Sequence, residues 1–272
     1  MFARLRPIIG GFLRRTGIDF VLRRYDLDFW RPYDRDYCAQ KYLRGEGIEI
    51  GALHQPQRLP PGVKVVYIDQ LSYEECIERF PELDSSSIVR PTVVEDGFHL
   101  ASITDESQDF LIAHHVLEHS PNPVQMLLNW GRVLKKGGIM LISVPPLEIS
   151  FDAGRELTSI EHLLEDFELY KSGITEEIFR RNKKHYEEWF LISTPAHYKE
   201  KGKEPLGLTK DEVLQLAERC LRDEIEIHFH TFTHASLKDL LKYFCTYLDR
   251  RFSVLVCTQS ELEIIGVLEK KL

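Results

Sequence analysis

The chain has 272 residues, of which 43% are hydrophobic and 29% charged, a composition typical of a folded globular protein and not of a disordered one. Its net charge of −8 disfavours nucleic-acid binding, which needs a basic surface to displace counterions. The five cysteines form no CxxC pair, so we expect no disulfide scaffold and a reducing, cytoplasmic location.

Residues 1–44 read as a helical segment with an unusual charge. The first 24 residues contain six arginines and one acid, and their apolar residues recur at helical spacing. We expect no secretory signal, because the segment has neither an uninterrupted apolar stretch nor a small-residue cleavage site. We expect an amphipathic helix packed on the domain, and peripheral contact with an anionic membrane is the alternative.

Four short apolar segments follow, and each is typical of a buried strand. They are residues 47–51, 63–69, 110–113 and 139–144. Between the last two, residues 122–136 keep a helical period in their apolar positions. Short buried strands that alternate with helices predict a parallel sheet covered on both faces.

The remaining chain divides into a charged helical stretch and a mixed end. Helices are expected at residues 159–170, 176–190 and 235–248, a strand at 225–231, and an antiparallel hairpin from 252–258 and 262–268. These elements predict an α/β fold with a mostly parallel sheet that ends in an antiparallel hairpin. Its parts are an N-terminal helical segment (1–44), a cofactor-binding core (45–146), a helical insert or lid after strand five (147–224), and the C-terminal part of the sheet (225–272).

Small and acidic residues stand at the ends of the predicted strands. Glu49 is followed by Gly51 and Ala52, whose small size lets a ligand approach the backbone closely. Asp69 ends the second strand, where an acid accepts hydrogen bonds from both hydroxyls of a ribose. Asp96, in a third loop, is placed to meet an adenine amino group.

A longer pattern carries the family resemblance. The segment Asp109-Phe-Leu-Ile-Ala-His-His-Val-Leu-Glu-His119 is followed by Ser-Pro-Asn-Pro and then by Arg132-Val-Leu-Lys-Lys-Gly-Gly138. With the strand-end residues, this order resembles the class I S-adenosylmethionine-dependent methyltransferases, in particular a small-molecule group with an HVLEH segment. The resemblance covers about residues 45–146 and, more loosely, the final hairpin. It implies an α/β, Rossmann-like fold with a seven-stranded, mostly parallel sheet whose last strand is antiparallel.

The resemblance implies a role for each matching position. Glu49 and Gly51, with Ala52 beside them, would hold the methionine end of S-adenosylmethionine, and Asp69 its ribose. Further cofactor contacts would come from Gln70, Leu71, Asp96, Gly97, Ala113 and His114. The chain departs from the family pattern in having only Gly51 in its first motif. It also has a proline-rich loop at residues 54–62 where a crossover helix is usual.

The single glycine and the missing crossover helix also bear on the alternative functions. A nicotinamide-dependent enzyme would need a glycine loop that opens a helix, and residues 54–62 do not supply one. A non-catalytic methyltransferase-fold scaffold, which has kept the sheet and lost the chemistry, stays open. The leading hypothesis is a methyltransferase acting on a small-molecule or saccharide-type acceptor, without a nucleic-acid partner.

Methyl transfer to a hydroxyl or a protonated amine needs a general base, and histidine suits this at neutral pH. The candidates are His114 after the fourth strand, His185 in the insert, and His230 in the predicted strand at 225–231. On a strand, His228, His230 and His234 would share a face. Without a carboxylate or cysteine at matching spacing, we expect no metal there.

Overall fold

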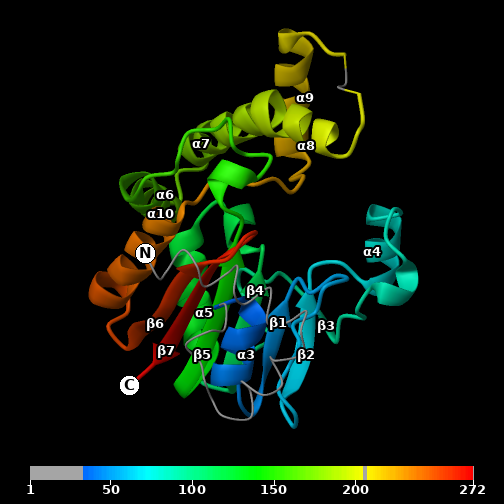
Figure 1. Cartoon of the computed structure of the whole chain (residues 1–272). Helices are drawn as coiled ribbons and strands as arrows, with labels where there is room; N and C mark the ends of the chain where they lie inside the picture. Colours follow the sequence, from blue (N-terminus) through cyan, green and yellow to red (C-terminus); the bar gives the residue numbers. More distant parts are fainter. Residues whose placement is uncertain (1–32, 205–206, 272) are drawn as a thin grey trace, which may run out of the picture.

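A mixed seven-stranded sheet in the order β3-β2-β1-β4-β5-β7-β6 forms the centre of the computed structural model, which describes residues 33–204 and 207–271 (Figure 1). In chain order the strands are β1 (Glu46–Ile50), β2 (Lys64–Asp69), β3 (Val93–Val94), β4 (Gln108–His114), β5 (Leu134–Val144), β6 (Phe252–Gln259) and β7 (Ile264–Lys270). Strands β3, β2, β1, β4 and β5 pair in parallel, and β7 is antiparallel to both β5 and β6. The predicted fold class and the terminal hairpin are confirmed.

One predicted strand is wrong. Residues 225–231 are extended but join no ladder, and the seventh strand is the two-residue β3 at the sheet edge. The alternation of apolar and polar residues in this segment has another cause. Ile227 and Phe229 pack into the insert, while His228 and His230 belong to polar clusters. The backbone N–H groups of Phe229 and His230 bond to the carbonyl of Glu118 instead of a neighbouring strand.

Helices cover the two faces of the sheet differently. On one face α3 (Arg35–Tyr42) packs through Cys38 and Ala39 against Phe110 and Ile112 of β4. On the other face lie the amphipathic α5 (Pro123–Val133) and α10 (His234–Tyr243), which continues as the π-helical η7 (Phe244–Leu248). Both helices match the predicted positions. The basic helix expected at the start of the chain falls in residues 1–32, outside the described part.

The connection between β1 and β2 contains no helix, as the prolines predicted. Leu59 and Val63 of this loop pack against the cluster under α3 instead. The helix that precedes β1 in sequence therefore covers the face on which a crossover helix would lie. The remaining short elements are α4 (Tyr73–Arg79), η3 (Ser85–Ser87), η4 (Leu117–His119) and η5 (Leu147–Ile149).

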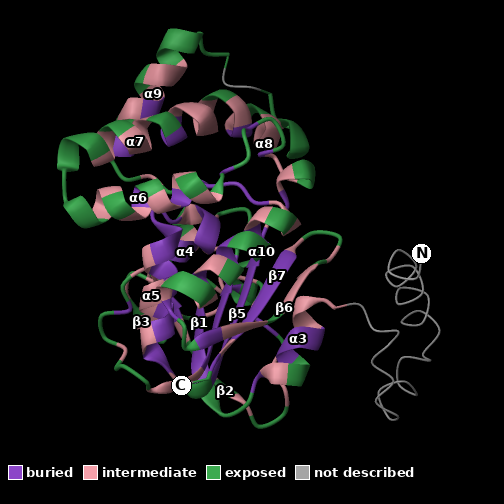
Figure 2. Ribbon diagram, turned by 90° about the vertical axis from the view of Figure 1, so that its left-hand side faces the viewer, coloured by how far each residue is buried: buried purple, intermediate pink, exposed green. Residues whose placement is uncertain are grey.

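The insert between β5 and α10 forms a layer of helices above the carboxyl ends of the parallel strands (Figure 1). It comprises α6 (Ile160–Ser172), α7 (Thr175–Glu188), the π-helical η6 (Trp189–Ser193), α8 (Thr194–Glu200) and α9 (Lys210–Arg222). Its helices keep much of their surface exposed, whereas the strands are largely buried (Figure 2). Among the described helices, none is long and apolar enough to cross a membrane.

A buried arginine joins this insert to the rest of the molecule. Arg155 donates to the carbonyls of His228 (2.7 Å) and Phe229 (2.8 Å) and forms an ion pair with Asp152 at 3.2 Å. Both side chains of this salt bridge are almost fully buried. Arg155 thereby fixes the backbone that carries His228 and His230.

The indole of Trp130 supports a loop at the sheet edge and allows a stability test. Trp130 is fully buried and donates from Nε1 to the carbonyl of Gly97 at 2.8 Å. We expect Trp130→Phe to lower the free energy of unfolding by about 1–3 kcal/mol, because it leaves that carbonyl unpaired. Urea denaturation measures this, with Trp189→Phe as the control; equal stability of Trp130→Phe and wild type would contradict it.

Candidate functional site

The carboxyl ends of β1, β2 and β4 leave an accessible stretch of backbone. Gly51 follows β1 with a φ of +66°, is exposed, and donates from its N–H to the carbonyl of Ile68 at 2.9 Å. A side chain here would be strained by the positive φ, and its Cβ would come within 3.2 Å of Val116. Glycine therefore keeps this part of the edge open to a ligand.

Two acidic side chains flank the opening. Asp69 ends β2 and accepts from the N–H of Leu71 at 3.0 Å, and burial raises the pKa of its carboxyl. Asp96 is exposed and is held by its own loop, through the N–H of Phe98 at 2.8 Å and the ring of His99 at 2.6 Å. The loop lies against β1, because Gly97 contacts Ile50 so closely that a Cβ would clash.

A buried polar network lies beneath the opening, on the side of α3. Gln57 donates from its backbone N–H to Oε1 of Glu49 (2.9 Å), and its side-chain oxygen faces Nε2 of His114 (3.0 Å). The other ring nitrogen of His114 faces the hydroxyl of Ser143 at 2.9 Å. Burial lowers the pKa of His114 to about 3, so the ring is neutral. Gln57 was missed from the sequence, where nothing marks one polar residue of a proline-rich loop.

Only one of the two carboxylate oxygens of Glu49 accepts a hydrogen bond in this network. Its Oε2 is buried and has no hydrogen-bond partner, and burial raises the pKa of the carboxyl to about 7. An unpaired buried carboxylate oxygen is costly unless a donor reaches it. A cationic or N–H group of a ligand would satisfy this atom if it reached it.

A charged histidine lies immediately beyond β4. His115 has a φ of +55°, a conformation that non-glycine residues adopt rarely and often at functional sites. Its ring lies 3.6 Å from the buried carboxylate of Glu118 and 3.2 Å from that of Glu263. Burial opposes the charge, but the hydrogen bond to Glu263 and the attraction of both carboxylates raise the pKa of His115 to about 9. No sequence signal ties Glu263 to this site, since it lies in the turn of the final hairpin.

A second set of polar residues bridges the edge from the insert side. Glu226 lies 3.2 Å from Nδ1 of His119 and accepts from the side chain of Gln70 at 3.2 Å. His119 stacks edge-on against His228, whose Nδ1 faces Asp152 at 2.7 Å. Burial lowers the pKa of His119, so its ring is neutral at physiological pH. This arrangement presents a neutral, partly exposed imidazole next to a carboxylate.

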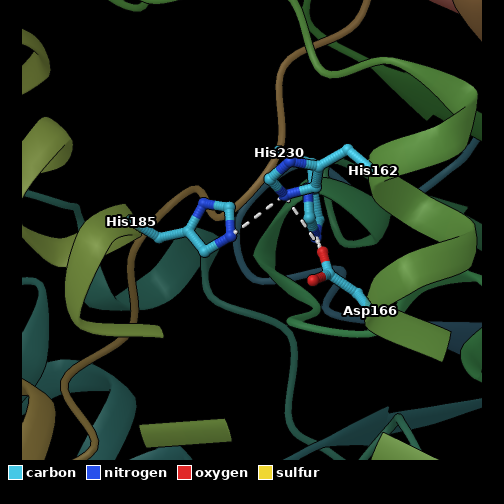
Figure 3. Close-up of side chains that lie close together, drawn as sticks. All are labelled: His162, Asp166, His185 and His230. Atoms are coloured by element: carbon cyan, nitrogen blue, oxygen red, sulfur yellow. Dashed lines mark hydrogen bonds and ion pairs between the residues drawn. The ribbon is translucent and has the colours of Figure 1, made fainter. Parts of the chain in front are cut away.

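The predicted catalytic histidines fall into two places. His114 belongs to the buried network under β4, whereas His185 and His230 lie together between the insert and the sheet, with ring centroids 5.0 Å apart (Figure 3). The structure also brings His162 and Asp166 of α6 to His185 and His230. His228, His230 and His234 do not share one strand face as proposed, because residues 225–231 form no strand and His234 begins α10. A catalytic role of His114, His185 and His230 stays a prediction.

Comparison with protein families identifies the core. Residues 50–142 match the family model described as a methyltransferase domain. This match spans about a third of the chain and supports a methyltransferase domain in the sheet core. The subgroup with the HVLEH segment stays a prediction, and a search of curated proteins finds no match.

Solved structures resemble this chain only distantly. An S-adenosylmethionine-dependent methyltransferase from Aquifex aeolicus has 9% identity and a TM-score of 0.44, with 87% of this chain and 89% of that chain covered. One from Methanosarcina mazei has 20% identity, a TM-score of 0.41, and 85% and 95% covered. A Rhodobacter sphaeroides protein described as a Zn-dependent alcohol dehydrogenase has 14% identity, a TM-score of 0.47, and 90% and 94% covered. Scores below 0.5 are too low to support any statement about this chain.

The charge on His115 predicts a pH-dependent stability. Its pKa is about 9 in the folded chain and about 6.5 when unfolded, so its ion pairs stabilise fully below pH 6.5 and are lost as the pH rises toward 9. We expect wild type to lose more stability than His115→Gln between pH 6.5 and 9. Urea midpoints across this range test it; a constant difference between the two proteins would show that folding does not raise the pKa of His115.

Proposed function

We propose that this methyltransferase transfers the methyl group of S-adenosylmethionine to a small, hydroxyl-bearing acceptor such as a saccharide. The observation that carries the proposal is the open edge around Gly51, bordered by Asp69 and His115, within a domain of the methyltransferase family. The acceptor would lie between this edge and the helical insert. A lid placed there excludes water during the transfer.

The residues at the edge fit the cofactor's functional groups. The unpaired Oε2 of Glu49 suits the ammonium of the methionine part, and the exposed Gly51 and the partly buried Ala52 allow close approach to the backbone. The carboxylate of Asp69 suits the two ribose hydroxyls. The remaining contacts would come from Gln70, Leu71, Asp96, Gly97, Ala113 and His114. For His114, whose ring nitrogens both face protein partners, the role is to hold Gln57 and through it Glu49.

The cofactor supplies a methyl group on a positively charged sulfur, which is the reactive centre. The protein has to align the acceptor for in-line attack and remove its proton. We assign the proton removal to His119, which is neutral, partly exposed and paired with Glu226. The carboxylate would orient the ring and stabilise the imidazolium that forms.

The charge of the edge favours one class of acceptor. Carboxylates of Glu118, Glu226 and Glu263 lie beside His115 and His119. Among the described residues, Arg35 is the only lysine or arginine that forms an ion pair with any of these three acids. Such a site repels phosphates and other anions. Carboxylates accept hydrogen bonds readily from hydroxyl groups, so a neutral hydroxylated molecule is the best match.

Cofactor binding provides the first test. Asp69→Ala should weaken binding of S-adenosylhomocysteine at least tenfold, about 1.4 kcal/mol, because the ribose hydroxyls lose their acceptor. Isothermal titration calorimetry measures the affinity, and Asp239→Ala, an exposed aspartate of α10, is the control. Unchanged affinity would overturn the ribose assignment, and no binding by wild type would favour the non-catalytic scaffold.

The second test concerns the base. We expect His119→Asn to lower the turnover number at least a hundredfold with unchanged affinity for S-adenosylhomocysteine, because the ring acts on the acceptor's proton. Release of S-adenosylhomocysteine is followed with neutral monosaccharides and polyols as acceptors, and His234→Asn is the control. Equal losses of turnover and affinity would assign His119 to cofactor binding, and transfer only to a protein or nucleic acid would overturn the acceptor class.

A further inference from the structure

Four metal-ligand side chains converge where the insert meets the residues before α10. His162 and Asp166 project from the same side of α6, His185 comes from the end of α7, and His230 from the extended segment after α9 (Figure 3). One ligand atom from each lies within 4.8 Å of all the others. Four residues spread over nearly 70 positions thus face one common point.

The separations match those around a four-coordinate metal ion. Nε2 of His162 lies 3.3 Å from Nε2 of His185 and 3.1 Å from Oδ2 of Asp166, which is 3.7 Å from Nε2 of His230. Ligand bonds of about 2.0–2.1 Å in tetrahedral geometry place neighbouring ligand atoms about 3.3 Å apart. The side chains would need only small adjustments to hold an ion.

Without an ion, this group is poorly satisfied. Oδ2 of Asp166 and both ring nitrogens of His230 are buried and make no hydrogen bond of normal geometry. Asp166 and His230 are each 1% exposed, and His185 is 6% exposed. Burial lowers the pKa of His185 to about 3 and that of His230 also falls, so both rings are neutral. Neutral imidazoles and a carboxylate with free lone pairs are the form in which these groups bind metals.

The surroundings orient the carboxylate toward the same point. Nε of Arg181 donates to Oδ1 of Asp166 at 2.6 Å, which leaves Oδ2 for the centre of the group. Such outer contacts are usual for metal-binding carboxylates. Arg181 is also paired with Glu165, and Arg155 with Asp152 and Glu188, so the nearby positive charges are compensated.

We propose that His162, Asp166, His185 and His230 bind a structural zinc ion that fastens the helical insert to the residues at the sheet edge. Three imidazole nitrogens and one carboxylate oxygen suit zinc better than magnesium or calcium, which prefer oxygen ligands. Four protein ligands leave no position for substrate, so the ion stabilises and does not react. It links α6 and α7 to the backbone of residues 228–231, which also borders the proposed acceptor site.

The first experiment uses the full chain with any affinity tag removed, because a histidine tag would bind metal itself. Mass spectrometry of the desalted protein should find close to one zinc per chain. Removal with EDTA should lower the melting temperature, and Zn²⁺, but not Mg²⁺, should restore it. Protein without zinc whose melting temperature does not respond to added Zn²⁺ would overturn the proposal.

Variants locate the ion. His162 is the most exposed member, so His162→Ala should still fold; it should bind zinc at least tenfold more weakly and lose the zinc-dependent rise in melting temperature. His197→Ala, a partly exposed histidine of α8 outside the group, should behave like wild type. The Co²⁺-loaded wild type should show the visible absorption of tetrahedral cobalt, and His162→Ala should not. A purely structural histidine cluster would instead lose stability in His162→Ala without any dependence on metal.

Discussion

Parallel pairing of β1 with both β2 and β4 is the constraint on which the site depends. It brings Gly51, Asp69 and His115, which are separated by tens of residues, to one edge of the sheet. The strands cannot continue there, because Gly51 and His115 adopt positive φ angles that turn the chain away. The edge therefore stays open and presents backbone and carboxylates together, which is what a nucleoside-containing cofactor needs.

The missing helix after β1 shows how the fold compensates for a local departure. The proline-rich loop that follows β1 contains no helix to cover the sheet. Instead α3, which precedes β1 in the chain, buries Cys38 and Ala39 against β4. The loop instead delivers Gln57 beneath the site, where it connects Glu49 to His114. The loop that replaces the usual helix thereby supports residues that we propose to bind the cofactor.

The segment 225–231 determines how the insert and the sheet act together. Arg155 holds its backbone, Glu226 reaches the edge beside His119, and His230 turns toward α6 and α7. Alternate residues serve the insert's apolar core and the polar clusters. A change in the insert would therefore reach the proposed base through a short, buried path, and a bound zinc ion would stiffen that path.

The sequence alone determined the fold class, the positions of four core strands, the terminal hairpin and the resemblance of the core to methyltransferases. These properties depend on local periodicity, on glycine and proline, and on short motifs, all of which can be read along the chain. Only the tertiary structure decided that residues 225–231 join no sheet, and that Gln57, Glu226 and Glu263 border the site. It also joined His162 and Asp166 to His185 and His230. The physical reason is that these contacts form between segments far apart in sequence, and no local pattern records which buried polar groups will face one another.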